Sequence, residues 1–429
     1  MKTLTSELDQ GPHVNKQSTP EGENMNNAVK KMQPELNGLN YTKDCLQDYY
    51  VISADAHVNE PFDMFASRVD KKFKDRMPHI EVDNEGRKWL RIEGLRPSRI
   101  REAPKEEGVS AEEFRSQHQQ ESASRPHLDA TKGAMFQKQG GFDEERYLDM
   151  NYDGIDVDIV FPNKGLANWQ SPDSVLNVEM CRVWNDWAYD TFNDNPRSYP
   201  AACIAPADID AAVKEIERSA ARGFHFAMMP PLLKEGGYNE AKYDRIWAAL
   251  CDANIPVVFH AGTGKEPRTA TGNGGAIINY VVHAMNTVVQ PVVELCGSGV
   301  FDRYPKLKFS TIEAGAGWLP YTLQAMDFGS EAFAFWVSPN LKYKPSEYFR
   351  MHGHASFEID DVAIASREAI GTQCLMWGND YPHIEGCWPY SAAQVDKWTR
   401  MGVTEAEKRD ILGMNAARLF NIPVPEQFV

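Results

Sequence analysis

The pattern of apolar and polar positions changes after residue 147, where short apolar runs begin to alternate with amphipathic stretches. The runs are rich in Val, Ile, Phe, Ala and Met, and the stretches 211–221 and 243–253 show helical spacing of their apolar positions. One similar apolar run, at residues 49–57, precedes this region. We therefore expect eight strands, at residues 49–57, 157–162, 201–206, 224–229, 255–260, 307–313, 355–359 and 374–380.

Eight strand-then-helix units favour one architecture, an α/β fold in which parallel strands form a (β/α)8 TIM-like barrel. We assign it to residues 46–429, and predict from their polar composition that residues 1–45 form an N-terminal arm. Residues 58–150 are charged, punctuated by Pro and without evenly spaced strands. We expect them to form a long insertion after strand 1, over the barrel mouth, where it would shape the substrate pocket.

Several predicted strands end in residues that can bind a metal. Asp55 and His57 lie two positions apart in an extended run and so point to the same side. His260 ends the fifth run, Glu313 the sixth and Asp380 the eighth. Because the carboxyl ends of parallel strands meet at one barrel mouth, these groups should converge. Imidazoles and carboxylates suit zinc, manganese or iron, so we predict a divalent metal site with Glu313 as an additional or bridging ligand.

Two further histidines are weaker candidates. His283, in the helical region between the fifth and sixth runs, could be another ligand or a substrate contact, and His383 follows Asp380 closely. Each candidate also has an ordinary structural explanation: a lone histidine is often a hydrogen-bonded interior residue, and Asp380 could simply form a turn. The agreement of several strand ends on one location favours the metal site.

Charge and cysteine content restrict the partners. The net charge of −16 opposes binding to nucleic acid or an anionic membrane, because phosphate groups would be repelled. We find no secretory signal and no run near the roughly 18 apolar residues that a membrane span needs. The seven cysteines are scattered without Cys-x-x-Cys spacing, which is typical of free thiols. We expect a cytoplasmic protein with a small-molecule substrate.

Six segments together resemble the amidohydrolase-related (amidohydrolase 2) family of metal-dependent hydrolases and decarboxylases, which includes aminocarboxymuconate-semialdehyde decarboxylase. The resemblance covers about residues 49–423 and is carried by residues 52–57, 256–262, 299–305, 313–320, 378–383 and 415–419. It implies a TIM-like barrel whose metal is bound at the first, fifth and eighth strand motifs. The resemblance and the frequency of symmetric oligomers also favour a homodimer, or a hetero-oligomer with a related barrel subunit.

The chain departs from the family pattern at two positions. The decarboxylases carry His-x-His or Glu-x-His on the first strand, whereas this chain has Asp55-x-His57. They also place a histidine at the end of the sixth strand, where this chain has Glu313. The familiar mechanism therefore does not transfer intact, and the additional carboxylate could hold a second cation.

Three functions are compatible with this site. The first is a metal-dependent hydrolase or decarboxylase acting on a small carboxylate or carbonyl compound, with Asp380 as ligand and proton shuttle and Glu313 or His283 as proton donor. The second is an oxygenase with two iron ions or a manganese–iron pair, since the ligands exceed what one tetrahedral zinc needs. The third is a non-catalytic partner subunit with a structural metal, which the intact ligand set disfavours.

Overall fold

The computed structural model of the protein describes residues 46–99 and 141–428, apart from positions 47, 62, 143, 266, 384, 389 and 390. The predicted N-terminal arm lies outside these residues. The described residues belong to the compact unit Tyr41–Val429.

The strands lie at or beside the predicted runs, which confirms those positions. The third predicted strand consists of two short pieces, and most of the strands are shorter than expected. Their side chains are almost entirely buried, as expected for parallel strands covered by helices. The strands are β1 (Ile52–Val58), β5 (Val157–Pro162), β6 (Ser198–Pro200), β7 (Ala202–Cys203), β8 (Ala227–Met229), β9 (Val257–His260), β10 (Phe309–Ile312), β11 (Gly353–Phe357) and β12 (Leu375–Trp377).

All neighbours among these strands pair in parallel. One sheet has the order β1-β5-β6 and the other β7-β8-β9-β10-β11-β12. Only Ala201 separates β6 from β7, and its amide donates to the carbonyl of Val160 on β5. After β12, a parallel bridge joins Tyr381 to Ala56, and the amide of Asp380 donates to the carbonyl of Asp55. Ala201 thus connects the two sheets along the chain, and the bridge between Ala56 and Tyr381 joins β1 to the residues that follow β12.

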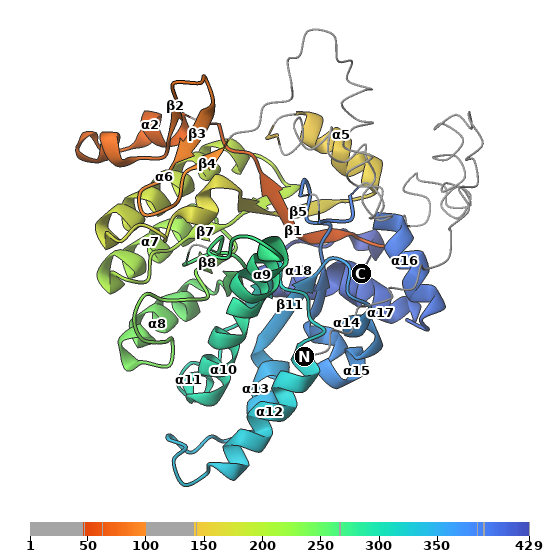
Figure 1. Cartoon of the computed structure of the whole chain (residues 1–429). Coiled ribbons are helices and arrows are strands. Elements are labelled where there is room, and N and C mark those ends of the chain that lie inside the picture. The colour runs from red at the N-terminus through yellow and green to blue at the C-terminus, as the bar shows by residue number, and fades with distance from the viewer. Residues whose placement is uncertain are drawn as a thin grey trace, which may run out of the picture. The chain divides into compact units, whose positions relative to one another are not determined.

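Helices follow the strands and lie around them in Figure 1. The two helices expected from sequence, α7 and α8, are confirmed. α7 begins where the carboxylate of Asp208 accepts from the amide of Ala211, and α8 ends at Asn254 in the left-handed conformation. The main helices are α6 (Ser174–Phe192), α7 (Ile209–Ala221), α8 (Asp244–Ala253), α10 (Val289–Gly297), α12 (Leu319–Ala332), α13 (Pro345–His352), α16 (Ser391–Arg400) and α18 (Asn415–Phe420).

The described part of the expected insertion forms a small sheet of its own, separate from the parallel strands. β2 (His79–Val82), β3 (Lys88–Arg91) and β4 (Ser98–Arg99) form an antiparallel sheet, preceded by α2 (Met64–Arg68) and followed, beyond the undescribed residues, by α5 (Glu144–Asp153). Asp83 accepts from the amides of Glu85 and Arg87 in the turn between β2 and β3. β2 and β3 are only four residues long and contain no buried residue, so the short apolar alternation of β2 is a weak signal in the sequence.

The expectation about apolar runs needs correction. The helical run Gly275–Gly297 comprises α9 (Gly275–Ile278), η5 (Asn279–Ala284), η6 (Met285–Val288) and α10. By length and composition alone it could cross a membrane, which is weak evidence for a span, and 22% of its most apolar window is buried. Sequence inspection missed it because polar residues interrupt the apolar ones. The six described cysteines are free thiols, and Cys45 lies outside the described residues.

We predict that Gly378→Ala will destabilise the fold where β12 meets β1. A Cβ on Gly378 would lie 2.7 Å from the backbone nitrogen of Asp55, which cannot move without disturbing the strand pairing. We expect a loss of about 1–3 kcal/mol in the free energy of unfolding, measured by denaturant titration. The control, Gly329→Ala in α12, adds its Cβ to open space and should be neutral or slightly stabilising. Equal effects of the two substitutions would contradict this account.

Candidate metal centre

β1 presents two buried ligand groups, Asp55 and His57. The Nδ1 atom of His57 lies 2.9 Å from the carbonyl oxygen of Pro162 at the end of β5. A proton on Nδ1 satisfies that carbonyl and leaves the lone pair of Nε2 for a metal. The neighbouring strand therefore sets both the tautomer and the orientation of this imidazole.

β9 supplies the second imidazole in the same way. His260 is fully buried, and its Nδ1 atom lies 2.8 Å from the carbonyl oxygen of Ala261. Its Nε2 atom lies 3.2 Å from Nε2 of His57. The two nitrogens thus point to one position.

Carboxylates from three strand ends surround these nitrogens. Oε2 of Glu313, after β10, lies 3.3 Å from Nε2 of His260. Oδ1 of Asp55 and Oδ1 of Asp380 lie 3.5 Å and 3.6 Å from Nε2 of His57. Glu313 and Asp380 both have positive φ, 56° and 51°, in the left-handed region that is uncommon for residues other than glycine. Such strain persists where the surrounding structure holds it, and it often marks functional sites.

The structure brings together every strand-end residue that the sequence singled out. The ligand atoms of Asp55, His57, His260 and Glu313 lie within 4.8 Å of one another, and so do those of a second group, in which Asp380 and His383 join His57 and Glu313. His283 is partly exposed on η5, and among the described residues it belongs to neither ligand group. A ligand or catalytic role for His283 therefore gains no support from this geometry.

His383 has a more prominent place than sequence reasoning gave it. Its Nδ1 atom lies 2.9 Å from Oδ1 of Asp380, and its ring lies 4.0 Å from the ring of His57, measured between centroids. The only sequence signal was its position three residues after Asp380 in a Tyr-Pro turn.

Unsatisfied carboxylate oxygens indicate that the site fits a cation. Both oxygens of Asp55 and Oδ2 of Asp380 are buried without a hydrogen-bond partner. Burying a carboxylate without a donor or a cation is costly, so buried charges are normally paired or coordinate a metal. Imidazole nitrogens and carboxylate oxygens are ligands of zinc, manganese and iron. The donor set therefore fits a divalent metal ion.

The charges of these groups strongly affect one another. Burial alone would raise the pKa of Asp55, but the imidazoles of His260 and His57 outweigh it and hold that pKa below its ordinary value. Burial and His383 favour neutral His57, but the carboxylates of Asp55 and Glu313 raise its pKa to about 9. Burial, together with the negative charges of Glu313 and Asp55, raises the pKa of Asp380 well above its usual range. A divalent cation would relieve this crowding.

Residues outside the ligand set hold the centre in place. Arg146 of α5 is fully buried. Its Nη1 atom donates to the carbonyl oxygen of His57 at 2.9 Å, and its Nε atom donates to the carboxylate of Asp158 at 2.8 Å. The amide of Asn379 donates to Oγ of Ser53 at 3.0 Å, which ties the turn before Asp380 to β1. Sequence reasoning missed these residues because nothing in their spacing reveals contacts over such long sequence separations.

A cavity of about 320 Å³ opens beside Glu313. Its walls combine apolar side chains, some from the insertion, with two cationic ones. They include Leu90, Ile92, Lys164, Arg268, Tyr280 and Met285. The described part of the insertion therefore contributes to a pocket at the metal centre.

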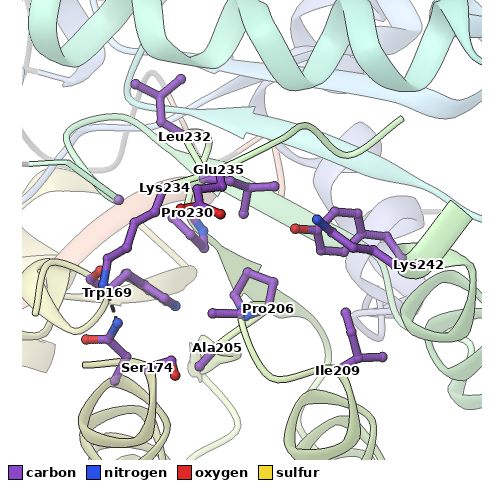
Figure 2. Close-up of a pocket in the computed structure, with 15 residues that line it drawn as sticks. Trp169, Ser174, Ala205, Pro206, Ile209, Pro230, Leu232, Lys234, Glu235 and Lys242 are labelled. Atoms are coloured by element: carbon purple, nitrogen blue, oxygen red, sulfur yellow. Dashed lines mark hydrogen bonds between the residues drawn. The ribbon is translucent and has the colours of Figure 1, made fainter. Parts of the chain in front are cut away.

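A second cavity, of about 420 Å³, lies among the loops that follow β5, β7 and β8. In Figure 2, Trp169 and Lys234 lie on one side of it and Ile209 and Lys242 on the other. None of the residues that line it belongs to either ligand group. The cavity beside Glu313 is therefore the better candidate for a substrate pocket.

We predict that metal binding releases protons and strengthens as the pH rises towards 9. His57 in the metal-free protein has a pKa of about 9 and must lose its proton before Nε2 can bind an ion. Isothermal titration of Mn²⁺ in two buffers with different ionisation enthalpies measures the protons released. Equal heats in both buffers, or an affinity independent of pH from 6 to 9, would contradict the predicted protonation of His57.

We predict that Asp380→Asn stabilises the metal-free protein at neutral pH. The folded-state pKa of Asp380 is raised, so metal-free stability falls as pH rises from the ordinary carboxyl pKa through the raised one. An uncharged amide avoids that loss. We expect the free energy of unfolding to increase by roughly 1–2 kcal/mol, which raises the Tm by a few degrees. The Tm gain on adding Mn²⁺ should shrink in the same variant. Asp252→Asn, at an exposed position of α8, should change neither quantity.

Comparison with known proteins agrees with the fold. The chain is similar to γ-resorcylate decarboxylase from Polaromonas sp. strain JS666, with 23% identity over 270 residues that cover 58% of this chain and 78% of the relative. An amidohydrolase structure from Mycobacterium avium subsp. paratuberculosis K-10 has a TM-score of 0.65 at 23% identity, over 88% of this chain and 99% of that one. A manganese-bound dihydroxybenzoic acid decarboxylase structure from Polaromonas sp. JS666 has a TM-score of 0.55 at 22% identity, over 72% and 94% of the two chains.

The sequence model of one family covers most of the chain. The matched residues, 55–422, begin at the first ligand of the metal centre and include all the others. This protein therefore belongs to the amidohydrolase family.

Proposed function

We propose that this protein is a metal-dependent decarboxylase that releases carbon dioxide from a small aromatic carboxylate. The observation that carries the proposal is the group of buried, unsatisfied carboxylates and inward-facing imidazoles beside a cavity with cationic walls. The decarboxylase activity of the relatives supports this reaction over hydrolysis. We further propose that the strands close into a TIM-type (β/α)8 barrel, which the bridge between Ala56 and Tyr381 supports.

The cavity beside Glu313 supports an aromatic, anionic substrate. Leu90, Ile92 and Met285 offer apolar contacts to a ring, while Lys164 and Arg268 offer positive charge in a site otherwise rich in carboxylates. Burial lowers the pKa of Lys164, and the backbone amides of residues 163–165 all donate to the buried carboxylate of Glu60, which fixes the loop that carries it. A guanidinium group pairs well with a carboxylate through two parallel hydrogen bonds.

Decarboxylation requires an acid beside the reacting carbon. When bound, a divalent ion would supply Lewis acidity that polarises and positions the substrate. The bond from the ring carbon to the carboxylate breaks, the electron pair stays on that carbon, and a proton replaces the departing carbon dioxide. Asp380, whose Oδ1 atom lies 2.9 Å from Nδ1 of His383, is placed to deliver that proton. Glu313 serves as a ligand in this proposal.

We propose manganese as the metal. The ligand set of two imidazoles and several carboxylates is rich in oxygen, which suits Mn²⁺. The manganese-bound decarboxylase relative supports the same choice. Elemental analysis of protein purified without added metal separates manganese from zinc and iron.

We predict that the Mn²⁺-loaded protein releases carbon dioxide from hydroxylated benzoates, beginning with γ-resorcylate, without oxygen. Arg268→Gln should raise KM about tenfold by removing the carboxylate contact. Lys265→Gln, a loss of charge at a neighbouring residue that does not line the cavity, is the matched control. Hydrolysis of esters or amides without carbon dioxide release would contradict decarboxylation.

A second candidate is an oxygenase with two metal ions, favoured by the two overlapping ligand groups. His57 offers a single nitrogen to the site because its Nδ1 atom is engaged by Pro162, so it can bind only one ion. A second ion would have to rely on Asp380 and His383, with Glu313 bridging the pair. Two iron atoms per chain, together with oxygen consumption that needs a reductant, would establish this function and overturn the first.

A further inference from the structure

The second cavity, which has no part in the proposed reaction, has the size and the walls of a ligand site. Its volume of about 420 Å³ lies within the range of small-molecule pockets. In Figure 2, Pro206 and Pro230 lie between Lys234 on one side and Lys242 on the other. Its apolar lining includes Trp169, Pro206, Ile209, Pro230, Leu233 and Tyr243.

Tight contacts keep two walls of this cavity in shape. Nε1 of Trp169 donates to the carbonyl oxygen of Ile204 at 2.7 Å, which fixes the orientation of the indole ring. Gly264 approaches the chain after β8 so closely that a Cβ on it would lie 2.4 Å from the carbonyl oxygen of Leu232. Because these walls are already held in place, a ligand would bind with little ordering of the protein.

Lys234 brings a positive charge to the cavity without an acidic partner. The residue as a whole is exposed, but its Nζ atom donates to the carbonyl oxygen of Ser171, which is fully buried. Among the described residues, no carboxylate forms an ion pair with this ammonium group. Burial lowers the pKa of Lys234, which is the expected effect on a cation that has lost water without gaining an anion. An ammonium group has three donors, so donors remain for a ligand.

The carboxylates around Lys234 do not take its place. Asp173 is already engaged by Nη1 of Arg76 at 2.8 Å and by the amide of Val175. Glu235 also lines the cavity, but its side chain is exposed, where water and salt screen its charge.

The other lysine of the cavity differs from Lys234. Lys242 pairs with Glu240 at 2.9 Å, so its charge is largely balanced. The unbalanced positive charge of this cavity is therefore at its Lys234 end, beside the indole ring of Trp169.

We infer that the second cavity binds a small carboxylate with an apolar chain or ring. The carboxylate oxygens would accept from Nζ of Lys234, and the apolar part would lie against Pro206 and Pro230. An inorganic anion would leave the apolar walls without contacts, and a neutral apolar molecule would leave the ammonium group without an anion.

Two chain segments separate this cavity from the one beside Glu313. Within residues 167–170, Trp169 lines the second cavity while Ala167 and Gln170 line the other. After β9, Gly264 lines the second cavity and Gly262 the other. Nε2 of Gln170 donates to the carbonyl oxygen of Lys265 at 3.2 Å, which joins the two segments. A ligand in the second cavity would thus rest on segments that also shape the cavity at the metal centre.

Isothermal titration of the full chain with octanoate tests the inference. We expect one site per chain with a Kd of roughly 0.1 mM, and binding of octanol at least about tenfold weaker because it lacks the charge. Lys234→Gln should weaken octanoate binding about tenfold. Lys214→Gln, the same change at an exposed position of α7 that does not line the cavity, is the matched control and should leave the affinity unchanged.

A second variant tests the location without removing a charge. Ala207 lines the cavity at an exposed position, so Ala207→Trp should fill the space and abolish octanoate binding. The circular dichroism spectrum and the Mn²⁺ affinity should stay unchanged, because Ala207 belongs to neither ligand group.

Three outcomes would overturn the inference. The first is no binding of octanoate up to about 1 mM. The second is an affinity that Lys234→Gln and Ala207→Trp both leave unchanged in folded protein. The third is loss of binding on Arg268→Gln, which would place octanoate in the cavity beside Glu313. None of these results bears on carbon dioxide release from hydroxylated benzoates, which is measured separately.

Discussion

The centre of this protein depends on buried carboxylates of Asp55, Glu313 and Asp380 held against two imidazoles. Without a cation, these groups repel one another and leave oxygens without partners, which is unfavourable in a folded interior. Much of the surrounding structure opposes that repulsion. The tight approach of Gly378 to β1, the left-handed backbone of Glu313 and Asp380, and buried Arg146 all keep the ligands from moving apart.

The same crowding connects the centre with its chemistry. In the metal-free protein it raises the pKa of Asp380, whose carboxylate lies close to that of Glu313 in the same ligand group. The cavity beside this crowded negative centre is lined by the cationic side chains of Lys164 and Arg268. A divalent ion and an anionic substrate complement the two halves of such a site, one negative and one positive. Glu313, where relatives of the decarboxylase type are expected to carry histidine, increases the negative half and makes the number of bound ions the central question.

The helical run Gly275–Gly297 connects the interior with the surface. One side of it supplies part of the cavity wall through Tyr280 and Met285, and the other side is apolar, uncharged and exposed. Its most apolar window is only 22% buried, so its hydrophobicity is not explained by the core of one chain.

Local sequence determined the strand positions and the candidate ligands at their ends, because periodicity defines a strand and parallel topology brings carboxyl ends together. Asp55, His57, His260, Glu313 and Asp380 could therefore be identified without coordinates. The sequence did not reveal the antiparallel sheet of β2–β4, because the short strands β2 and β3 contain no buried residue. Only tertiary structure decided the roles of His383 and Arg146 and the exposure of the helical run Gly275–Gly297. These depend on turn geometry and on contacts between distant segments, which no local pattern encodes.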